Sequence, residues 1–222
     1  KAGDYHTLTI DGETKIQAKT VIISTGATAK YLGLPSEEKF MGFGVSACAV
    51  CDGFFYKGQE VVVVGAGDTA AEEATYLAKI CPKVTLLVRR DQMRASKAMQ
   101  NRVLNTNNIE IKWNTETVEI QGGQSVETVV VKNTLTGEIE NIAASGFFVA
   151  IGHKPNTDIF KGILDMDETG YLTPTLGKTA TNKPGVFAAG DVADKVYRQA
   201  VTAAGTGCMA ALESERYLSE FH

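Results

Sequence analysis

One stretch restricts the fold of this chain more than any other: a β-branched run that leads directly into a glycine turn. Val61–Val64 is typical of a fully buried parallel strand. Gly65-Ala-Gly67-Asp-Thr-Ala70 follows it at once. Residues 68–80 then predict a helix with one apolar side, and Val84–Val88 predicts another strand. A strand, a glycine turn, a helix and a strand in this order form a βαβ unit, which predicts an α/β fold with a parallel sheet.

The glycine turn has the spacing of a dinucleotide-binding site. Gly65 permits the tight turn, Gly67 lets a pyrophosphate approach the backbone, and Ala70 keeps the helix close to the strand. Asp68 and Thr69 begin the helix, whose first N–H groups can hold a phosphate. A purely structural glycine turn is the alternative. Because the turn joins a predicted strand to a predicted helix, we favour nucleotide binding.

Basic residues occupy the position that decides between the two nicotinamide cofactors. In NAD-binding proteins an acidic residue about 20 positions after the turn binds the ribose hydroxyl. This chain has Arg89 and Arg90 there, with Arg94 one turn further into a predicted helix over residues 93–105. Guanidinium groups suit a 2′-phosphate by charge and by bidentate geometry. We therefore favour NADPH over the alternative, a solvated basic helix.

Two cysteines separated by two residues, Cys48 and Cys51, precede the glycine turn. A structural zinc site needs two further ligands at similar spacing, and Cys81 and Cys208 stand alone. Redox chemistry needs only two thiols, one of them with a lowered pKa. We therefore predict a redox dithiol and no metal, with the adjacent Asp52 able to move protons. A reversible disulfide fits a reducing compartment, so we expect a cytoplasmic protein.

Two aromatic residues, Phe54 and Phe55, follow the dithiol. They can belong to the core, or they can dock a protein that carries a substrate disulfide. The sequence alone favours neither alternative.

Two further apolar runs end in glycine turns. Residues 21–23 lead into Thr25 and Gly26, and residues 186–189 lead into Gly190 and Asp191. The carboxyl ends of parallel strands are where open α/β sheets bind ligands, and an acidic residue there can hold a sugar hydroxyl. A plain strand-to-loop turn explains the first motif as well. Taken alone, the second motif is better explained by an Asp that caps a turn.

Length and charge limit the possible partners. The chain has 222 residues and a net charge of −4, so we expect neither a nucleic acid nor a membrane as partner. No apolar stretch reaches the ~18 residues needed to span a bilayer. The chain starts at Lys1 without a Met, in a segment that reads as the middle of a domain. We therefore expect a boundary of processing or expression there.

Together these motifs resemble the low-molecular-weight thioredoxin reductases of the bacterial type. The resemblance follows the chain in order and rests on residues 48–53, 65–70, 88–91, 147–153, 185–191 and 198–211.

The resemblance implies two Rossmann-like three-layer nucleotide-binding domains, with an NADPH domain inserted into an FAD domain. Residues 1–31 and 156–222 would belong to the FAD domain, and residues 32–155 would form the NADPH domain with the dithiol. The NADPH-binding residues would be Gly65, Gly67, Asp68, Thr69, Ala70, Arg89, Arg90, Arg94 and Gly152. The FAD-binding residues would be Thr25, Gly26, Gly190, Asp191, Arg198, Gln199 and Ala200.

The resemblance also implies a reaction. Hydride would pass from NADPH to FAD, and the flavin would reduce the disulfide of Cys48 and Cys51. Cys51 would face the flavin, Cys48 would attack the disulfide of thioredoxin, and Asp52 would supply protons. The nicotinamide and the dithiol would take turns at the flavin by domain rotation. A homodimer is implied as well.

One departure from the family pattern limits this expectation. The family opens with its own glycine-rich FAD fingerprint, whereas this chain contains only the turn assigned to NADPH. Roughly 100 residues, a usual size for part of a domain, would be missing before Lys1. We therefore expect this chain alone to bind FAD poorly and to turn over little.

Two other functions remain possible from the sequence. The flavoprotein subunit of an alkyl hydroperoxide reductase shares this architecture but prefers NADH, so the arginines argue against it. A non-catalytic nucleotide-binding or redox-sensing module is the other alternative.

Overall fold

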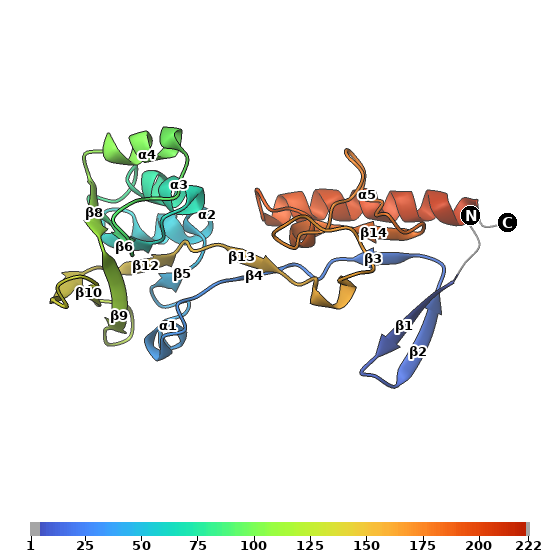
Figure 1. Cartoon of the computed structure of the whole chain (residues 1–222), viewed down its shortest axis with the longest axis horizontal. Helices are drawn as coiled ribbons and strands as arrows, with labels where there is room; N and C mark the ends of the chain where they lie inside the picture. Colours follow the sequence, from blue (N-terminus) through green and yellow to red (C-terminus); the bar gives the residue numbers. More distant parts are fainter. Residues whose placement is uncertain (1–4, 221–222) are drawn as a thin grey trace. The chain divides into compact units, whose positions relative to one another are not determined.

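The computed structural model describes residues 5–220, and the chain divides into two compact units (Figure 1). The central unit contains residues 29–152, and the flanking unit contains residues 1–28 and 153–222. The outermost residues of the predicted FAD domain, 1–4 and 221–222, lie outside the described part. At the points where the chain passes from one unit to the other, β4 (Ala27–Ala29) and β13 (His153–Pro155) form a two-stranded sheet.

The central unit is built on a five-stranded parallel sheet, as the βαβ pattern predicts. The strands lie in the order β5, β12, β6, β7, β8, and each neighbouring pair is parallel. They are β5 (Val45–Ser46), β12 (Gly146–Val149), β6 (Val61–Val64), β7 (Val84–Val88) and β8 (Ile109–Trp113). The helices of this unit are α1 (Pro35–Lys39), α2 (Ala49–Asp52), the 3₁₀-helix η1 (Gly53–Tyr56), α3 (Asp68–Leu77) and α4 (Lys97–Leu104).

A second, antiparallel sheet covers the other face of the parallel sheet. Its strands are β9 (Thr115–Gln121), β10 (Thr128–Asn133) and β11 (Ile139–Ala143), with β10 in the middle. The sequence predicts antiparallel strands on an edge over residues 118–131 and 138–142. Their antiparallel pairing is confirmed, but they form a sheet of their own. They form a separate layer because their apolar side chains, such as Ile120 and Val129, pack on the face that carries Val62 and Val64.

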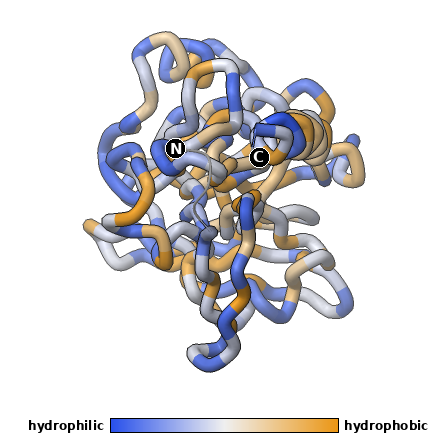
Figure 2. The backbone as a smooth tube through the Cα atoms, turned by 90° about the vertical axis from the view of Figure 1, so that its right-hand side faces the viewer, coloured by the Kyte–Doolittle hydropathy of each residue, from blue (hydrophilic) through white to orange (hydrophobic). Residues whose placement is uncertain are grey.

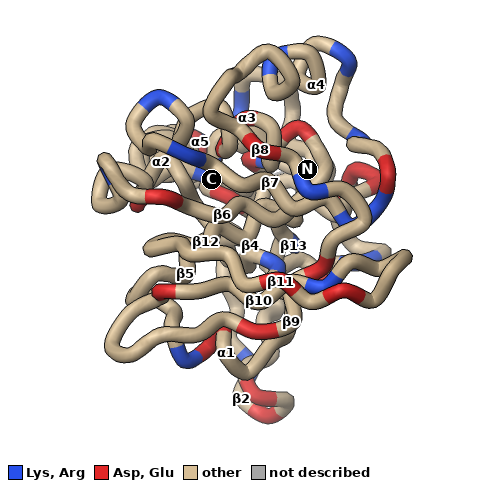
Figure 3. The backbone as a smooth tube through the Cα atoms, turned by 90° about the vertical axis from the view of Figure 1, so that its left-hand side faces the viewer, with Lys and Arg blue, Asp and Glu red and all other residues tan. Residues whose placement is uncertain are grey.

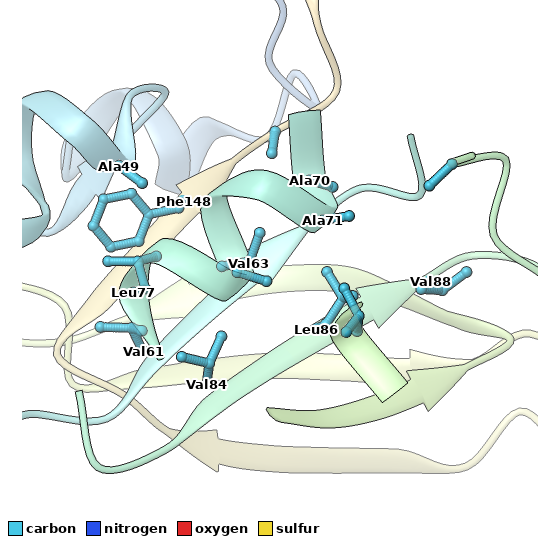
Figure 4. Packing of buried hydrophobic residues seen from close by; sticks show 14 of the residues in the cluster. Ala49, Val61, Val63, Ala70, Ala71, Leu77, Val84, Leu86, Val88 and Phe148 are labelled. Atoms are coloured by element: carbon cyan, nitrogen blue, oxygen red, sulfur yellow. The ribbon is translucent and has the colours of Figure 1, made fainter. Parts of the chain in front are cut away.

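The central unit is thus three layers with two cores. Successive residues of β6 point to opposite faces, so Val61 and Val63 face the helices while Val62 and Val64 face the antiparallel sheet. On the helix side, Figure 4 shows Ala49, Leu77 and Phe148 in one patch of the core. Phe148 is fully buried, and its ring lies edge-on to Tyr56 with centroids 5.4 Å apart. In Figure 1, α3 and α4 lie on one side of β6, with β9 and β10 on the other.

Helix boundaries differ from the predicted ones at functionally relevant places. α4 begins at Lys97 because Ser96 is its N-cap and accepts a hydrogen bond from the Met99 amide. Arg94 therefore lies in the loop before the helix. The sequence predicts a connection over residues 28–46, and α1 lies within it. Glu37 of α1 is buried and accepts hydrogen bonds from the amides of Leu32 and Leu34 at 3.0 Å each.

The flanking unit has much less sheet. The sequence predicts a hairpin in which the turn Asp11-Gly12 joins a strand over residues 5–10 to a return strand over residues 15–24. β1 (His6–Ile10) and β2 (Thr14–Ala18) form this hairpin. The predicted return strand over residues 15–24 is wrong as one element, because it breaks after Ala18 and β3 (Val21–Ile23) pairs elsewhere. β3 lies parallel to β14 (Val186–Ala188), with Val21 opposite Val186. Two 3₁₀-helices, η2 (Asp158–Phe160) and η3 (Gly190–Val192), complete the unit with helix α5.

The sequence predicts a last helix over about residues 205–218. Helix α5 (Ala200–Ser219) starts five residues earlier. Only Ala210 and Ser214 of this helix are buried. Apolar side chains such as Val201 are exposed, and Figure 2 shows hydrophobic turns among hydrophilic ones along its coil. Within the described residues, no helix is both long and apolar enough to cross a membrane.

Candidate nucleotide and dithiol site

A cavity of about 510 Å³ opens at the carboxyl ends of β6, β7 and β12 in the central unit. The glycine turn lines it after β6, Arg89 lines it after β7, and Gly152 lines it after β12. This is the edge at which open parallel sheets bind nucleotides. Other lining residues from these segments include Thr69, Arg94, Ala150 and Ile151.

The glycines of the turn have the two properties that a dinucleotide requires. At Gly65, φ is +151° and a Cβ would lie 2.4 Å from the Ala150 carbonyl oxygen and 2.7 Å from the Ala70 Cβ. Only glycine fits there. At Gly67, a Cβ would meet nothing within 4 Å, so the space beside the backbone is open to a phosphate. The turn is held by a hydrogen bond from the Gly65 amide to the Leu87 carbonyl at 3.1 Å.

The arginines lie on the exposed loop between β7 and α4. Arg89 and Arg94 line the main cavity, and Arg90 joins them around an adjacent hollow of about 70 Å³ with Ala66 and Gln92. Figure 3 shows Lys and Arg segments beside α4. The loop presents several guanidinium groups next to the glycine turn, which suits the 2′-phosphate of NADPH by charge and geometry.

Asp68 is absent from the residues that line the cavity. Its carboxylate Oδ1 instead accepts a hydrogen bond from the Ser96 amide at 2.9 Å. Hydrogen bonds from the backbone and then the side chain of Ser96 lower the pKa of Asp68. Thr69 lines the cavity, and Ala70 is buried beneath Gly65.

Part of the cavity wall comes from segments that the sequence does not point to. Thr115, Glu116 and Thr117 line it from β9, and Leu32 and Leu34 line it from the segment before α1. The Thr117 hydroxyl is buried and has no hydrogen-bond partner among the described residues. A polar, threonine-containing strand is not a nucleotide signature, so only the packing of β9 beside β7 reveals these residues.

The dithiol lies at the start of α2. Cys48 and Cys51 are joined by a disulfide, with Cys48 half-buried and Cys51 exposed. Cys48 is the N-cap of α2, and its Sγ accepts a hydrogen bond from the Cys51 amide at 3.2 Å. Gly53 lets this short helix approach α3, since a Cβ there would lie 2.9 Å from Leu77.

Asp52 is held beside the disulfide by Ser46. The buried Ser46 hydroxyl donates to Asp52 Oδ2 at 2.6 Å and accepts from the Cys48 amide at 3.1 Å. Burial, and after it the charge of Asp52, raises the pKa of Tyr56. Burial also raises the pKa of Tyr31, followed by the charges of Glu37 and Asp52. The Asp52 carboxylate therefore lies close enough to Tyr31 and Tyr56 for its charge to affect both.

The aromatic pair after the dithiol is on the surface. Phe54 is 68% exposed and Phe55 is 76% exposed, next to Val50, which is 60% exposed. The alternative that these two phenylalanines belong to the core is therefore wrong. Tyr56, the next residue, is the one that packs inward against Phe148.

The predicted FAD-binding residues fall in two groups within the flanking unit. Because β3 and β14 are parallel, Thr25 and Gly26 lie at the same sheet edge as Gly190 and Asp191. Gly190 donates its amide to the Thr206 hydroxyl of α5 at 2.9 Å. The second group, Arg198, Gln199 and Ala200, forms the start of α5, where Gln199 is the N-cap.

The remaining cysteines take no part in this site. Cys81 is buried and donates to the Tyr56 carbonyl at 3.4 Å, and Cys208 is exposed. Among the described residues, no group of three or more His, Cys, Asp or Glu side chains is arranged to hold a metal ion.

The fold and the site together define a class of protein, a nucleotide-binding unit that carries a redox disulfide. In agreement, residues 2–207 match the family model of the pyridine nucleotide-disulphide oxidoreductases.

Three relatives narrow the class. The thioredoxin reductase of Streptomyces clavuligerus is 52% identical over 98% of this chain and 67% of its own length. That of Dictyostelium discoideum is 57% identical over 94% of this chain and 66% of its own length. The crystal structure of the Streptococcus pyogenes thioredoxin reductase superposes with a TM-score of 0.93 at 41% identity, covering 99% of this chain and 71% of that one. The chain belongs to the thioredoxin reductase family, of whose members it spans about two thirds. Membership in this family implies FAD and NADPH as cofactors.

Proposed function

We propose that this chain carries the NADPH-binding and dithiol-bearing part of a flavoprotein that reduces the disulfide of thioredoxin. One observation carries the proposal: the Cys48–Cys51 disulfide and the nucleotide cavity lie in the same unit. The names of the relatives support thioredoxin as the substrate. We assign residues 32–155 to the NADPH domain and residues 1–31 and 156–222 to the FAD domain.

The cysteines exchange electrons with the substrate by thiol–disulfide interchange. The Cys48 thiolate attacks one sulfur of the thioredoxin disulfide, whose S–S bond breaks as a mixed disulfide forms. The departing thioredoxin sulfur takes up a proton. Cys51 then attacks Cys48 Sγ, which releases the second thioredoxin thiol and restores the Cys48–Cys51 disulfide. Two electrons have then moved from the dithiol to thioredoxin. NADPH and FAD, when bound, would supply two electrons as hydride, and these would reduce the Cys48–Cys51 disulfide again.

Cys48 is the better candidate for the attacking residue. Its Sγ accepts the Cys51 amide hydrogen bond, and the same bond would stabilise a thiolate at this position. Asp52 would supply and remove protons, and Ser46 would hold its carboxylate in place. The exposed Phe54 and Phe55 would contact thioredoxin next to the dithiol, because exposed aromatic residues commonly anchor protein interfaces.

The loop of residues 89–96, which we call the arginine loop, supports NADPH over NADH as the cofactor. Arg89, Arg90 and Arg94 would bind the 2′-phosphate, while Gly65, Gly67 and Gly152 would let the nucleotide lie against the backbone. In the flanking unit, Thr25, Gly26, Gly190, Asp191 and the start of α5 would contribute to the FAD site. A cytoplasmic location and a homodimer complete the proposal, supported by the reducing conditions that a reversible dithiol needs and by the family resemblance.

The roles of the two cysteines can be tested without either cofactor. A thioredoxin with a single active-site cysteine, activated as its mixed disulfide with 5-thio-2-nitrobenzoate, reports attack by releasing a yellow thiolate. We expect the Cys51→Ser variant to form a stable mixed disulfide through Cys48, identified by mass spectrometry. The matched Cys48→Ser variant should react much more slowly. Equal rates for the two variants would contradict the assigned roles.

The cofactor preference needs a separate measurement. NADP⁺ and NAD⁺ are titrated into the chain by calorimetry, alongside the Arg94→Ala variant. We expect the chain to bind NADP⁺ more tightly, and the variant to lose about tenfold or more of that affinity, as expected for a charged hydrogen bond. Tighter binding of NAD⁺ would favour the alkyl hydroperoxide reductase alternative, and no binding of either would favour a non-nucleotide role.

A further inference from the structure

We propose that Asp68 is a positioning residue, which holds the arginine loop in the conformation that recognises the 2′-phosphate and thereby sets the preference for NADPH. The inference rests on the proposed function of the arginines as phosphate ligands. It assigns Asp68 a role different from the direct nucleotide contact that the sequence motif predicts.

The loop of residues 89–96 is tied to the glycine turn by hydrogen bonds at its far end. The amides of Arg94 and Ala95 both donate to the Ala66 carbonyl, at 2.7 and 3.0 Å. The Ser96 amide donates to Asp68 Oδ1 at 2.9 Å. The first two bonds end on a backbone carbonyl that every residue type supplies. The third depends on the side chain at position 68, so it is the bond that the sequence specifies.

The inner side of the same loop is anchored by packing. Met93 and Ala95 are buried, and Arg94 between them is exposed. Gln100 of α4 donates from Nε2 to the Ala95 carbonyl at 2.7 Å. Alternate burial of this kind directs Arg94 outward, and the Asp68 bond fixes the point at which the loop turns into α4.

Ser96 connects the loop to the helix. Its hydroxyl accepts the Met99 amide hydrogen at the start of α4, while its own amide is bound by Asp68. One residue therefore fixes both the end of the loop and the direction of α4. Without the Asp68 carboxylate, the Ser96 amide would lose its acceptor. The segment that carries Arg94 would keep its bonds to Ala66 and Gln100 and the packing of Met93 and Ala95, but it would lose its link to the start of α3.

A direct phosphate contact is a poor explanation for Asp68. A carboxylate at the first turn of α3 would repel the pyrophosphate that the glycine turn accepts. Asp68 is exposed, lies outside the cavity lining, and directs an oxygen at an amide of the opposite loop. Because NAD⁺ lacks the 2′-phosphate, loss of the bond should affect NADP⁺ and spare NAD⁺.

Two substitutions separate the hydrogen bond from the charge. Asp68→Ala removes both, whereas Asp68→Asn removes the charge and keeps an oxygen that can accept from the Ser96 amide. Glu72→Ala, an exposed acidic residue one turn further along α3, controls for the loss of a negative charge on this helix. Dissociation constants for NADP⁺ and NAD⁺ are measured by calorimetry for each variant, with amide hydrogen exchange of residues 93–99.

We expect Asp68→Ala to weaken NADP⁺ binding about tenfold, the effect of losing one hydrogen bond to a charged group, and to leave NAD⁺ binding unchanged. Exchange at the Ser96 amide should accelerate. Asp68→Asn and Glu72→Ala should keep the NADP⁺ to NAD⁺ ratio of the unsubstituted chain, and Asp68→Asn should keep Ser96 protected.

Three outcomes would overturn the inference. If Asp68→Ala and Asp68→Asn both bound NADP⁺ and NAD⁺ more tightly by the same factor, the effect would be one of charge alone. An unchanged ratio in Asp68→Ala, while Arg94→Ala lowers the ratio, would show that the loop needs no anchor. An unchanged rate of Ser96 exchange in Asp68→Ala would show that the bond does not restrain the loop. An unchanged ratio in Arg94→Ala would instead refute the proposed role of the arginines.

Discussion

The two units of this chain bury their apolar residues to very different extents. The central unit has a parallel sheet covered on both faces, with Phe147, Phe148 and Leu87 fully buried. In the flanking unit, the parallel sheet consists of β3 and β14 alone, and α5 buries one apolar side chain, Ala210. Every residue that lines the nucleotide cavity, and both cysteines of the dithiol, belong to the central unit, so its own sheets and helices form the site.

Exposed apolar residues are the other side of this comparison. Val201 of α5 is 78% exposed, and Leu8, Ile10 and Ile16 of the hairpin are 40–45% exposed. Burying such side chains would be worth about 1.5–3 kcal/mol each. The flanking unit therefore leaves the apolar side chains of its hairpin and of α5 in contact with solvent.

The largest expected effect tests the core of the central unit. Phe148→Ala should lower its free energy of unfolding by about 3–5 kcal/mol, because it removes a fully buried ring and leaves a cavity. Urea denaturation followed by the fluorescence of Trp113, the single tryptophan and a residue of β8, reports this unit. The matched change in the flanking unit, Val201→Ala, followed by the circular dichroism of helix α5, should stay within about 0.5 kcal/mol. A large loss from Val201→Ala would contradict the contrast between the units.

The two glycines of the turn should separate stability from binding. Gly65→Ala should destabilise the central unit by roughly 1–3 kcal/mol, because its Cβ would clash with the Ala150 carbonyl in a backbone conformation that favours glycine. Gly67→Ala should leave the unfolding transition of the same unit in place, since its Cβ meets open space. Nucleotide titration should nevertheless show weaker binding in Gly67→Ala. Normal NADP⁺ affinity in Gly67→Ala would show that the pyrophosphate does not bind beside Gly67.

A loss of similar size is expected from the buried carboxylate of Glu37, before the central sheet. Glu37→Ala removes the acceptor of the Leu32 and Leu34 amides, which should cost about 1–3 kcal/mol. Faster hydrogen exchange at these two amides, compared with the exposed control Glu38→Ala, is the direct measurement. Unchanged exchange would mean that water replaces the carboxylate without cost.

The smallest effect concerns acid stability in the flanking unit. Burial alone would raise the pKa of Asp167, but hydrogen bonds from Lys195, Thr169 and the Tyr171 amide outweigh it and hold the pKa well below its usual range. A depressed carboxyl pKa stabilises the folded state above the unfolded pKa of about 4 and loses this contribution as the pH falls below it. Asp167→Asn should therefore lower the melting temperature at pH 7. At pH 2–3 the melting temperatures of the variant and of the unsubstituted chain should lie closer together. An equal difference at both pH values would contradict the ionic origin.

The sequence by itself determined the parts of the molecule that depend on neighbours along the chain. The unbroken apolar run Val61–Val64 and the helix after it predicted the βαβ unit, and Asp11-Gly12 predicted the hairpin of β1 and β2. Local spacing also identified Cys48, Cys51 and the glycine turn, because two thiols or two glycines a few residues apart must lie close together. The loop of residues 89–96 was visible as a run of arginines.

Tertiary structure alone decided which distant segments meet. Nothing in the local pattern of β9 places Thr115 and Thr117 at the cavity, because its alternation is that of any half-buried strand. The exposure of Phe54 and Phe55 likewise depended on tertiary packing, because Tyr56 is the aromatic residue of η1 that packs against Phe148. The partner of Asp68 is the sharpest case. Its bond to Ser96 joins residues 28 positions apart, and only the packing of two loops at one sheet edge brings them within 2.9 Å.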